Sequence, residues 1–207
     1  MTVQSTSDPS HLAYTSGTLT LHVDFPTIAY SPEFQIFHCI HQVSGSDAGS
    51  TWYCDGFAAA HHLKREYPKA FRILSEYKCY NRDVGTDYIA YDSICWHPIL
   101  RLDRFGELEG IFLSNHMRGD RFSVKAKDEL FHWYEAYYRF MRLLHDHERF
   151  LVRVKLQPGE IVVFDNLRVM HGRPEFELKN DEKRHIELIY CDTDSVYANA
   201  RSLASAK

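Results

Sequence analysis

The segment LTLHVDF, residues 19–25, alternates apolar and polar side chains, which is the pattern of a half-buried β-strand. Successive side chains of a strand point to opposite faces, so His22 and Asp24 share one face and lie within reach of a common point. This arrangement suits a pair of metal ligands. An isolated His-x-Asp triplet is a weak signal, because a chain with 13 histidines contains roughly one by chance. The triplet therefore needs a third group elsewhere in the sequence.

The stretch FDNLRVMHGR, residues 164–173, supplies that group, because His171 ends a predicted strand there. Two histidines and one carboxylate, with no fourth protein ligand, form the facial triad of non-haem Fe(II) oxygenases and leave coordination positions open. A bidentate 2-oxo acid takes two such positions and O2 a third. A planar guanidinium suits the distal carboxylate of the 2-oxo acid, and Arg184 is the candidate. Arg168 and Arg173 flank the distal ligand and either orient a nearby carboxylate or form ordinary surface salt bridges.

The composition is that of one globular domain, since 207 residues with 44% apolar and 25% charged content can form a single core. The net charge of -4, with scattered Lys and Arg, disfavours nucleic acid and anionic membranes as partners. The five cysteines lack a CxxC pair and predict neither a disulfide framework nor a thiolate zinc site. No apolar run approaches the length of a membrane span, and the N-terminus shows no targeting pattern. We therefore expect a cytoplasmic location, or a mitochondrial one if the native start lies upstream.

The order of elements predicts residues 1–10 as a flexible tail and residues 11–207 as one catalytic domain. Its core consists of strands, with helices packed outside. Strands are predicted within 19–25, 33–43, 150–156, 160–165, 167–172 and 184–192, helices within 55–66, 69–77 and 128–147, and a hairpin turn at 103–106. The predicted fold class is therefore mostly β with flanking helices, a jelly-roll barrel.

Several segments, in order, resemble one family over about residues 11–203. They are LAYTSGTLTLHVDFP (12–26), FQIFHCIHQ (34–42), DGF (55–57), DVGTDY (83–88), VKLQPGEIVVFDNLRVMHGR (154–173) and RHIELIYCDTD (184–194). This pattern is similar to the TauD-like family of γ-butyrobetaine dioxygenase and trimethyllysine dioxygenase, Fe(II)/2-oxoglutarate-dependent enzymes of carnitine biosynthesis. Such a series of matches is much more specific than the triad alone.

The resemblance implies a double-stranded β-helix core and assigns roles to individual residues. Iron would be held by His22, Asp24 and His171, and 2-oxoglutarate by Arg184, with the Thr51 hydroxyl on the same carboxylate. Ascorbate would be a further cofactor, and O2 the second small-molecule substrate.

The resemblance also implies a trimethylammonium substrate. A quaternary ammonium has no N–H to donate and is best held over aromatic faces. Tyr14 and Tyr190 match positions that line such a cage, and Asn115 matches an asparagine near the substrate, although Gly119 looks like an insertion beside it. Apart from the resemblance, a tyrosine near a strand end is more often ordinary packing.

The largest departure from the family pattern is that only 21 residues precede His22, so the zinc-binding N-terminal module and the first core segments are expected to be missing. We expect hydroxylation of γ-butyrobetaine to L-carnitine. Trimethyllysine hydroxylation, a truncated metal-binding member without hydroxylase activity, and a product with no stable fold stay open as alternatives. A homodimer is the expected oligomer.

Overall fold

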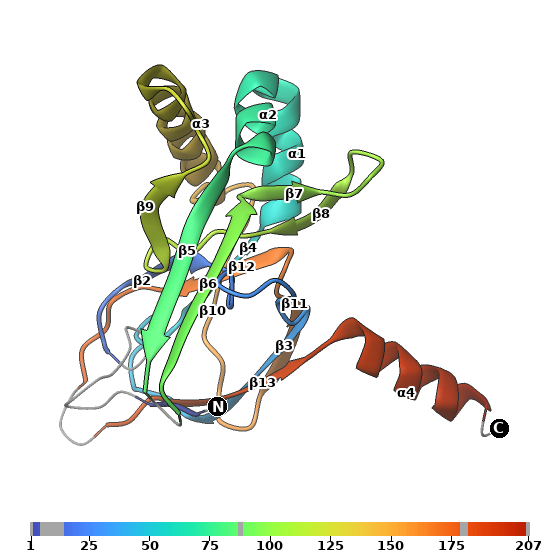
Figure 1. Ribbon diagram of the computed structural model, residues 1–207. Coiled ribbons are helices and arrows are strands. Elements are labelled where there is room, and N and C mark those ends of the chain that lie inside the picture. Colours follow the sequence, from blue (N-terminus) through green and yellow to red (C-terminus); the bar gives the residue numbers. More distant parts are fainter. Residues whose placement is uncertain (1, 5–14, 87–88, 179–181, 206–207) are drawn as a thin grey trace.

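The computed structural model describes residues 2–4, 15–86, 89–178 and 182–205. Its centre is a pair of four-stranded antiparallel sheets that face each other (Figure 1). The first sheet has the order β1 (Thr2–Gln4), β13 (His185–Cys191), β3 (Phe34–His41), β11 (Ile161–Asp165). The second has the order β10 (Leu151–Val154), β4 (Thr51–Asp55), β12 (Val169–Arg173), β2 (Leu19–His22). Strands distant in sequence are thus neighbours in space, and the predicted mostly β, jelly-roll fold class is confirmed.

The space between the two sheets is filled by the inward side chains of alternating strands. Phe37 and Cys39 of β3 are buried there, with Phe164 of β11 and Tyr53 of β4. The register between β4 and β12 also determines which of their side chains face the first sheet. Because Tyr53 and His171 are direct partners in the ladder between these strands, both side chains face the first sheet. The inner faces therefore hold the candidate site.

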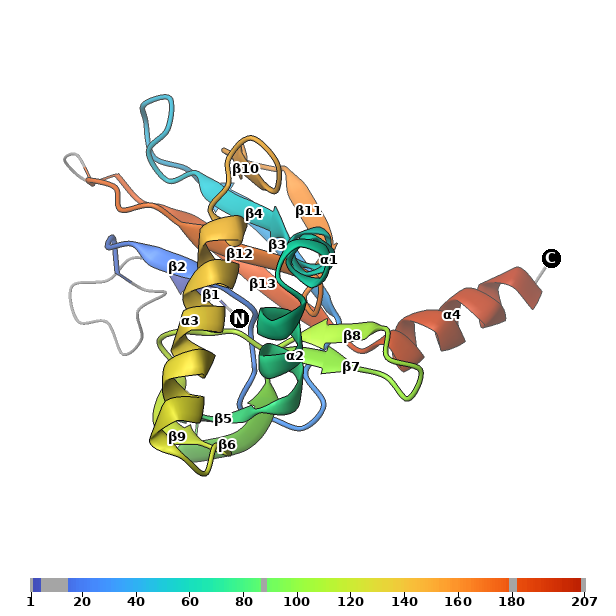
Figure 2. The same ribbon diagram turned by 90° about the horizontal axis from the view of Figure 1, so that it is seen from above.

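Three helices cover the opposite face of the second sheet (Figures 1 and 2). They are α1 (Gly56–Glu66), α2 (Pro68–Glu76) and α3 (Lys127–Leu144). Asp55 begins α1 as predicted, since its Oδ1 accepts hydrogen bonds from the amides of Phe57 and Ala58 at 3.1 Å each. Arg168 binds the same carboxylate at 2.7 Å, so of the two interpretations of Arg168 the exposed salt bridge is the one observed. Trp133 of α3 lies at the centre of this second core.

The remaining elements lie outside the two sheets. They are β5 (Lys78–Gly85), β6 (Tyr91–Pro98), β7 (Leu100–Leu102), β8 (Leu108–Ile111), β9 (Arg118–Phe122) and α4 (Thr193–Ser205). The hairpin of β7 and β8 turns where predicted, because Asp103 accepts the amides of Phe105 and Glu107 and Gly106 has φ of 83°. Helix α4 projects from the body and buries none of its residues (Figure 2). No helix of the described residues is long and apolar enough to span a membrane.

Three details correct the predicted boundaries. The first strand ends at His22 rather than residue 25, because the amide of Val23 bonds to the carbonyl of Leu113 and Phe25 adopts φ of 59°. Residues 2–4 of the expected tail form β1, which pairs with the free edge of β13, and residues 5–10 lie outside the described residues. The long helix ends at Leu144, and α4 was not predicted.

Candidate metal centre

Three side chains expected as metal ligands meet between the two sheets. Within the described ranges, His22, Asp24 and His171 form the group of possible ligand residues whose donor atoms all lie within 4.8 Å of one another. His22 and His171 are partners in the β2–β12 ladder, and their ring centroids are 4.3 Å apart. Asp24 lies beyond the end of β2 and reaches back, with its Oδ1 3.3 Å from Nε2 of His22. The structure thus brings together all three predicted ligands.

The hydrogen bond of His22 tests whether these atoms fit a cation. Its Nδ1 donates to the carbonyl of Thr20 at 2.8 Å, so in the neutral imidazole Nε2 carries the lone pair. This lone pair faces the Asp24 carboxylate, which is acceptor-only when ionised. Two acceptors that face each other are stabilised by a cation between them. Together with the ligand types, two imidazoles and one carboxylate, this arrangement fits Fe(II).

The ring of His171 is positioned by packing. Phe37 and Phe164 contact it with ring centroids at 5.2 and 5.4 Å, and its Nδ1 has no hydrogen-bond partner among the described residues. Burial, reinforced by the neighbouring His22, lowers the pKa of His171 to about 3. The imidazole is therefore neutral at physiological pH, which is the form that binds metal.

The Asp24 carboxylate is held by two donors from the opposite sheet. Oδ2 accepts from Nε2 of Gln35 at 2.5 Å and from the hydroxyl of Tyr190 at 2.7 Å. Burial alone would raise the pKa of Asp24, but the two neighbouring imidazoles and the hydrogen bond from Tyr190 favour the carboxylate and hold this pKa well below its usual range. Because Oδ2 already has two partners, Oδ1 is the oxygen left to a metal. Three coordination positions of an octahedral ion then stay free of protein atoms.

The backbone on both sides of Asp24 is fixed by one buried amide side chain. Oδ1 of Asn166 accepts from the Asp24 amide at 2.9 Å, and its Nδ2 donates to the carbonyls of Asp24 and Pro32 at 3.0 and 3.1 Å. Asn166 is fully buried. Its three bonds stabilise the turn in which Phe25 takes the left-handed conformation that non-glycine residues rarely adopt. The segment after β2 thereby aims the carboxylate at the two histidines.

Replacing Tyr190 by Phe should weaken metal binding, since it removes one of the two donors to Oδ2 and keeps the ring. We expect the affinity for Mn(II) to fall roughly tenfold. Isothermal titration of Mn(II) into the Tyr190→Phe protein measures this. Tyr197→Phe, on exposed α4, is the control and should bind like the wild type. An unchanged Mn(II) affinity for Tyr190→Phe would show that Gln35 alone positions the carboxylate.

The predicted co-substrate residues lie together, since Thr51 begins β4 and Arg184 directly precedes β13 of the facing sheet. Nη2 of Arg184 donates to the Thr51 hydroxyl at 3.3 Å, and its Nε donates to the carbonyl of Gly49 at 3.0 Å. Burial lowers the pKa of Arg184 to about 10, so its guanidinium stays charged at neutral pH. A buried cation beside a hydroxyl can receive a carboxylate in paired hydrogen bonds. The second buried guanidinium, Arg173, donates instead to the carbonyls of Thr15 and Gly17.

The predicted substrate residues are less closely grouped. Tyr190 joins the metal centre through its hydroxyl, and its ring packs edge-on against Phe25 at 4.9 Å. Asn115 is exposed, and its Oδ1 accepts from Arg118 and Tyr137 at 3.1 and 3.2 Å. Tyr14 lies outside the described residues. The role of all three as substrate ligands stays a prediction.

Sequence reasoning missed several residues of the centre. Gln35 could have been found, because it is a polar residue on the same inward face of β3 as Phe37 and Cys39. Asn166 directly follows β11, a position that signals a turn but not its partner. His116, the neighbour of Asn115, stands edge-on to His22 with ring centroids 4.9 Å apart, and nothing in the local pattern indicates this contact.

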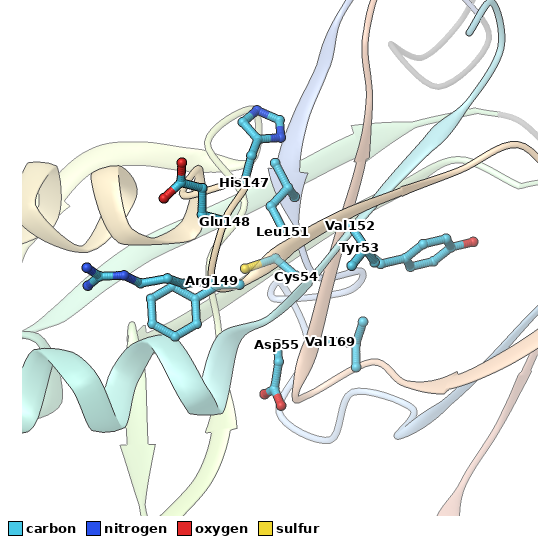
Figure 3. Close-up of a pocket in the computed structure, with 10 residues that line it drawn as sticks. Tyr53, Cys54, Asp55, His147, Glu148, Arg149, Leu151, Val152 and Val169 are labelled. Carbon is cyan, nitrogen blue, oxygen red and sulfur yellow. The ribbon is translucent and has the colours of Figure 1, made fainter. Parts of the chain in front are cut away.

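A surface pocket of about 370 Å³ lies beside this region but does not include the triad (Figure 3). It is lined by Tyr53, Cys54, Asp55, His147, Glu148, Arg149, Phe150, Leu151, Val152 and Val169. In Figure 3 the phenol of Tyr53 points away from His147 and Glu148. The pocket is thus formed at the strand edge, whereas the Tyr53 hydroxyl is directed elsewhere.

The facing sheets and the two-histidine, one-carboxylate cluster define the class of jelly-roll, mononuclear non-haem iron oxygenases. The sequence matches the family described as "Taurine catabolism dioxygenase TauD, TfdA family" over residues 1–190. The chain belongs to this family of dioxygenases.

Curated relatives support a closer group. Gamma-butyrobetaine dioxygenase of Homo sapiens is 35% identical over 202 residues, which cover 97% of this chain and 51% of the human protein. The enzyme of that name from Pseudomonas sp. (strain AK-1) is 35% identical over 94% of this chain and 48% of its own length. Mitochondrial trimethyllysine dioxygenase of Mus musculus is 31% identical over 79% of this chain and 38% of its own length. The chain thus spans about half the length of the first two relatives.

Solved structures agree on the fold. An asparagine oxygenase crystallised with Fe(II), 2S,3S-3-hydroxyasparagine and succinate superimposes with a TM-score of 0.67 at 16% identity, covering 93% of this chain and 56% of that one. A putative alpha-ketoglutarate-dependent taurine dioxygenase from Burkholderia xenovorans gives 0.63 at 17% identity, covering 83% and 58%. These likenesses support the jelly-roll core.

Proposed function

We propose that this chain carries the iron and 2-oxoglutarate site of a hydroxylase that converts γ-butyrobetaine to L-carnitine. The observation that carries the proposal is the His22, Asp24 and His171 cluster, with the buried Arg184–Thr51 pair joining the same two sheets. The 35% identical relatives named gamma-butyrobetaine dioxygenase support the choice of substrate.

In this proposal, Nε2 of His22, Oδ1 of Asp24 and Nε2 of His171 hold Fe(II). Fe(II) held there would supply the activation of O2, with 2-oxoglutarate oxidised to succinate and CO2 and one oxygen atom inserted into a C–H bond of the substrate. Ascorbate would keep the iron in its ferrous form. The atoms balance because the second oxygen atom of O2 enters succinate.

The chain's own residues prepare this chemistry. Arg184 and Thr51 orient the co-substrate through its distal carboxylate. Gln35 and Tyr190 occupy Oδ2 of Asp24, so the carboxylate binds through one oxygen and leaves room for the reactants. Phe37 and Phe164 pack against the ring of His171 and fix its orientation. Each group is in place before the reactants bind, which lowers the reorganisation that the reaction requires.

Substrate binding would use the aromatic ring of Tyr190, together with Tyr14 and Asn115, around the trimethylammonium acid. The ring and the hydroxyl of Tyr190 would then have separate roles. Its ring contributes to the cage, and its hydroxyl holds Asp24. Substrate bound in the cage would therefore contact Tyr190, whose hydroxyl donates to the candidate metal ligand Asp24.

Two alternative functions are tested by the same succinate-release experiment, described below. Trimethyllysine hydroxylation is supported by relatives such as the mouse enzyme at 31% identity. A metal-binding chain without hydroxylase activity would need only the His22, Asp24 and His171 cluster.

The test is succinate release by purified protein with Fe(II), ascorbate and 2-oxoglutarate. Three reactions are compared: with γ-butyrobetaine, with trimethyllysine and without an amine. Stimulation by γ-butyrobetaine that is lost in His171→Ala is the expected result. Stimulation by trimethyllysine alone would replace the substrate, and Mn(II) binding without any turnover would favour the metal-binding chain.

The proposal also includes an oligomeric state and a cellular location. The first is a homodimer, which light scattering after size exclusion measures as twice the 24.3 kDa chain mass. The second is a cytoplasmic location, or a mitochondrial one if the native chain begins upstream, which imaging of the full-length gene product decides.

A further inference from the structure

Tyr53 is a buried tyrosine whose hydroxyl makes no well-formed hydrogen bond to the described residues. The residue is 7% exposed, and its Oη is buried without a hydrogen-bond partner of good geometry among the described residues. An unpaired buried hydroxyl destabilises a folded protein unless a water or a ligand completes its bonding. Among the described residues no group completes the bonding of this hydroxyl, so a ligand can do so.

The position of Tyr53 directs this hydroxyl to the co-substrate region. Thr51 lies two residues earlier on the same strand, so both side chains face inward. His171 is the ladder partner of Tyr53 on the neighbouring strand. Tyr53 thus lies between a predicted metal ligand and a predicted co-substrate ligand.

Neighbouring rings keep the phenol from turning away. Phe164 packs edge-on against Tyr53 with centroids 5.4 Å apart, and Phe37 lies at 6.5 Å. In Figure 3 the ring points away from His147 and Glu148, which line the same surface pocket as Tyr53. A buried ring with an edge-on aromatic neighbour is suited to present its hydroxyl as a donor in a fixed place.

The charge near the hydroxyl is positive. Burial raises the pKa of Tyr53, and the Arg184 guanidinium and the Thr51 hydroxyl offset only part of the rise. The phenol therefore keeps its proton at physiological pH and can act as a donor. Arg184, itself 6% exposed, donates at 3.3 Å to the hydroxyl of Thr51, which lies on the same inward face of β4 as Tyr53. A cation and two hydroxyls gathered in one buried place form a receptor for a carboxylate.

We propose that the Tyr53 hydroxyl is a third donor to the distal carboxylate of 2-oxoglutarate, beside Arg184 and Thr51. The inference rests on the proposed function, because it needs a 2-oxo dicarboxylic acid at the metal. It explains why the inner face of β4 carries a tyrosine where a phenylalanine would pack equally well. It also predicts selectivity, since a 2-oxo acid without a distal carboxylate gains nothing from this hydroxyl.

The experiment measures equilibrium binding to Mn(II)-loaded protein under argon, so no turnover is required. 2-Oxoglutarate and pyruvate, which lacks the distal carboxylate, are titrated into wild type, Tyr53→Phe, Arg184→Gln and Tyr77→Phe. Tyr53→Phe removes the hydroxyl and keeps the ring. Tyr77→Phe is the matched control, because its hydroxyl bonds to Glu129 on the helical side of the molecule.

We expect Tyr53→Phe to raise the Kd of 2-oxoglutarate roughly tenfold to a hundredfold, since the bond is to a charged group, and to leave pyruvate binding unchanged. An unchanged Kd for 2-oxoglutarate in Tyr53→Phe, while Arg184→Gln weakens it, would overturn the inference and leave the proposed function standing. Equal weakening of both ligands would also overturn it, because the hydroxyl would then be structural. A wild type that binds neither 2-oxo acid would overturn the inference and the proposed function together.

Discussion

The Asp24→Asn protein is expected to fold like the wild type and to bind Fe(II) or Mn(II) more than about a hundredfold more weakly, a larger loss than removing a residue behind a ligand produces. The asparagine oxygen can still accept the bonds of Gln35 and Tyr190 that now reach Oδ2. The amide nitrogen then takes the place of Oδ1 and faces Nε2 of His22. A donor thus replaces the ligand oxygen, and the surrounding hydrogen bonds are kept.

Metal titration and thermal unfolding with and without Mn(II) measure this result. An ion that binds only the folded state raises the melting temperature, so wild type should shift with Mn(II) and Asp24→Asn should not. Asp103→Asn is the control, because its side-chain oxygen can still accept the turn amides of Phe105 and Glu107 far from the centre. Mn(II) affinity of Asp24→Asn within threefold of wild type would contradict the assignment of Asp24 as a ligand. Succinate release should be lost in parallel.

The Gly172→Ala protein is expected to lose about 1 to 3 kcal/mol of unfolding free energy, the usual effect of forcing extra atoms into a packed interior. A Cβ at position 172 would lie 2.7 Å from the carbonyl oxygen of Leu19 and 3.1 Å from the amide nitrogen of Leu21. Both are backbone atoms of β2, so no side chain can move aside. β2 must shift from β12, which separates His22 from His171.

Two measurements separate this effect from a general loss of stability. Urea denaturation gives the change in unfolding free energy, and Mn(II) titration of the folded protein gives the change in metal affinity. Both should fall in Gly172→Ala. Gly17→Ala is the control, because its added Cβ would have 3.6 Å to the nearest atom and a permitted backbone. Unchanged stability and metal affinity in Gly172→Ala would mean that the two strands tolerate a wider separation.

Most of the β core was predictable from local patterns. The strand-like segments 33–43, rich in apolar and β-branched residues, and 184–192 predicted β3 and β13, and Asp55 correctly marked the start of α1. The prediction of the first strand was less accurate, because alternation continued through Phe25 while the chain had already turned. A left-handed turn at a phenylalanine has no local signal. It is maintained by Asn166, which lies 142 residues away from Asp24.

The candidate site was likewise predictable in part from local sequence and in part not. By itself, the sequence determined which residues have the chemistry of iron ligands and of a carboxylate receptor, because His22, Asp24, His171 and Arg184 stand in short, recognisable segments. Residue type and local spacing are enough for that. The side chains that hold these groups were not indicated, since their contacts join strands that are far apart in the chain.

Only the tertiary structure decided how the site is built. The pairing of β4 with β12 places Tyr53 beside His171, and the facing of the two sheets brings Tyr190 to Asp24. These contacts depend on register and on the distance between sheets, and a one-residue slip would turn every side chain to the other face. The sequence therefore determined the candidate ligands and the fold class, and the packing of the two sheets determined the geometry of the candidate site.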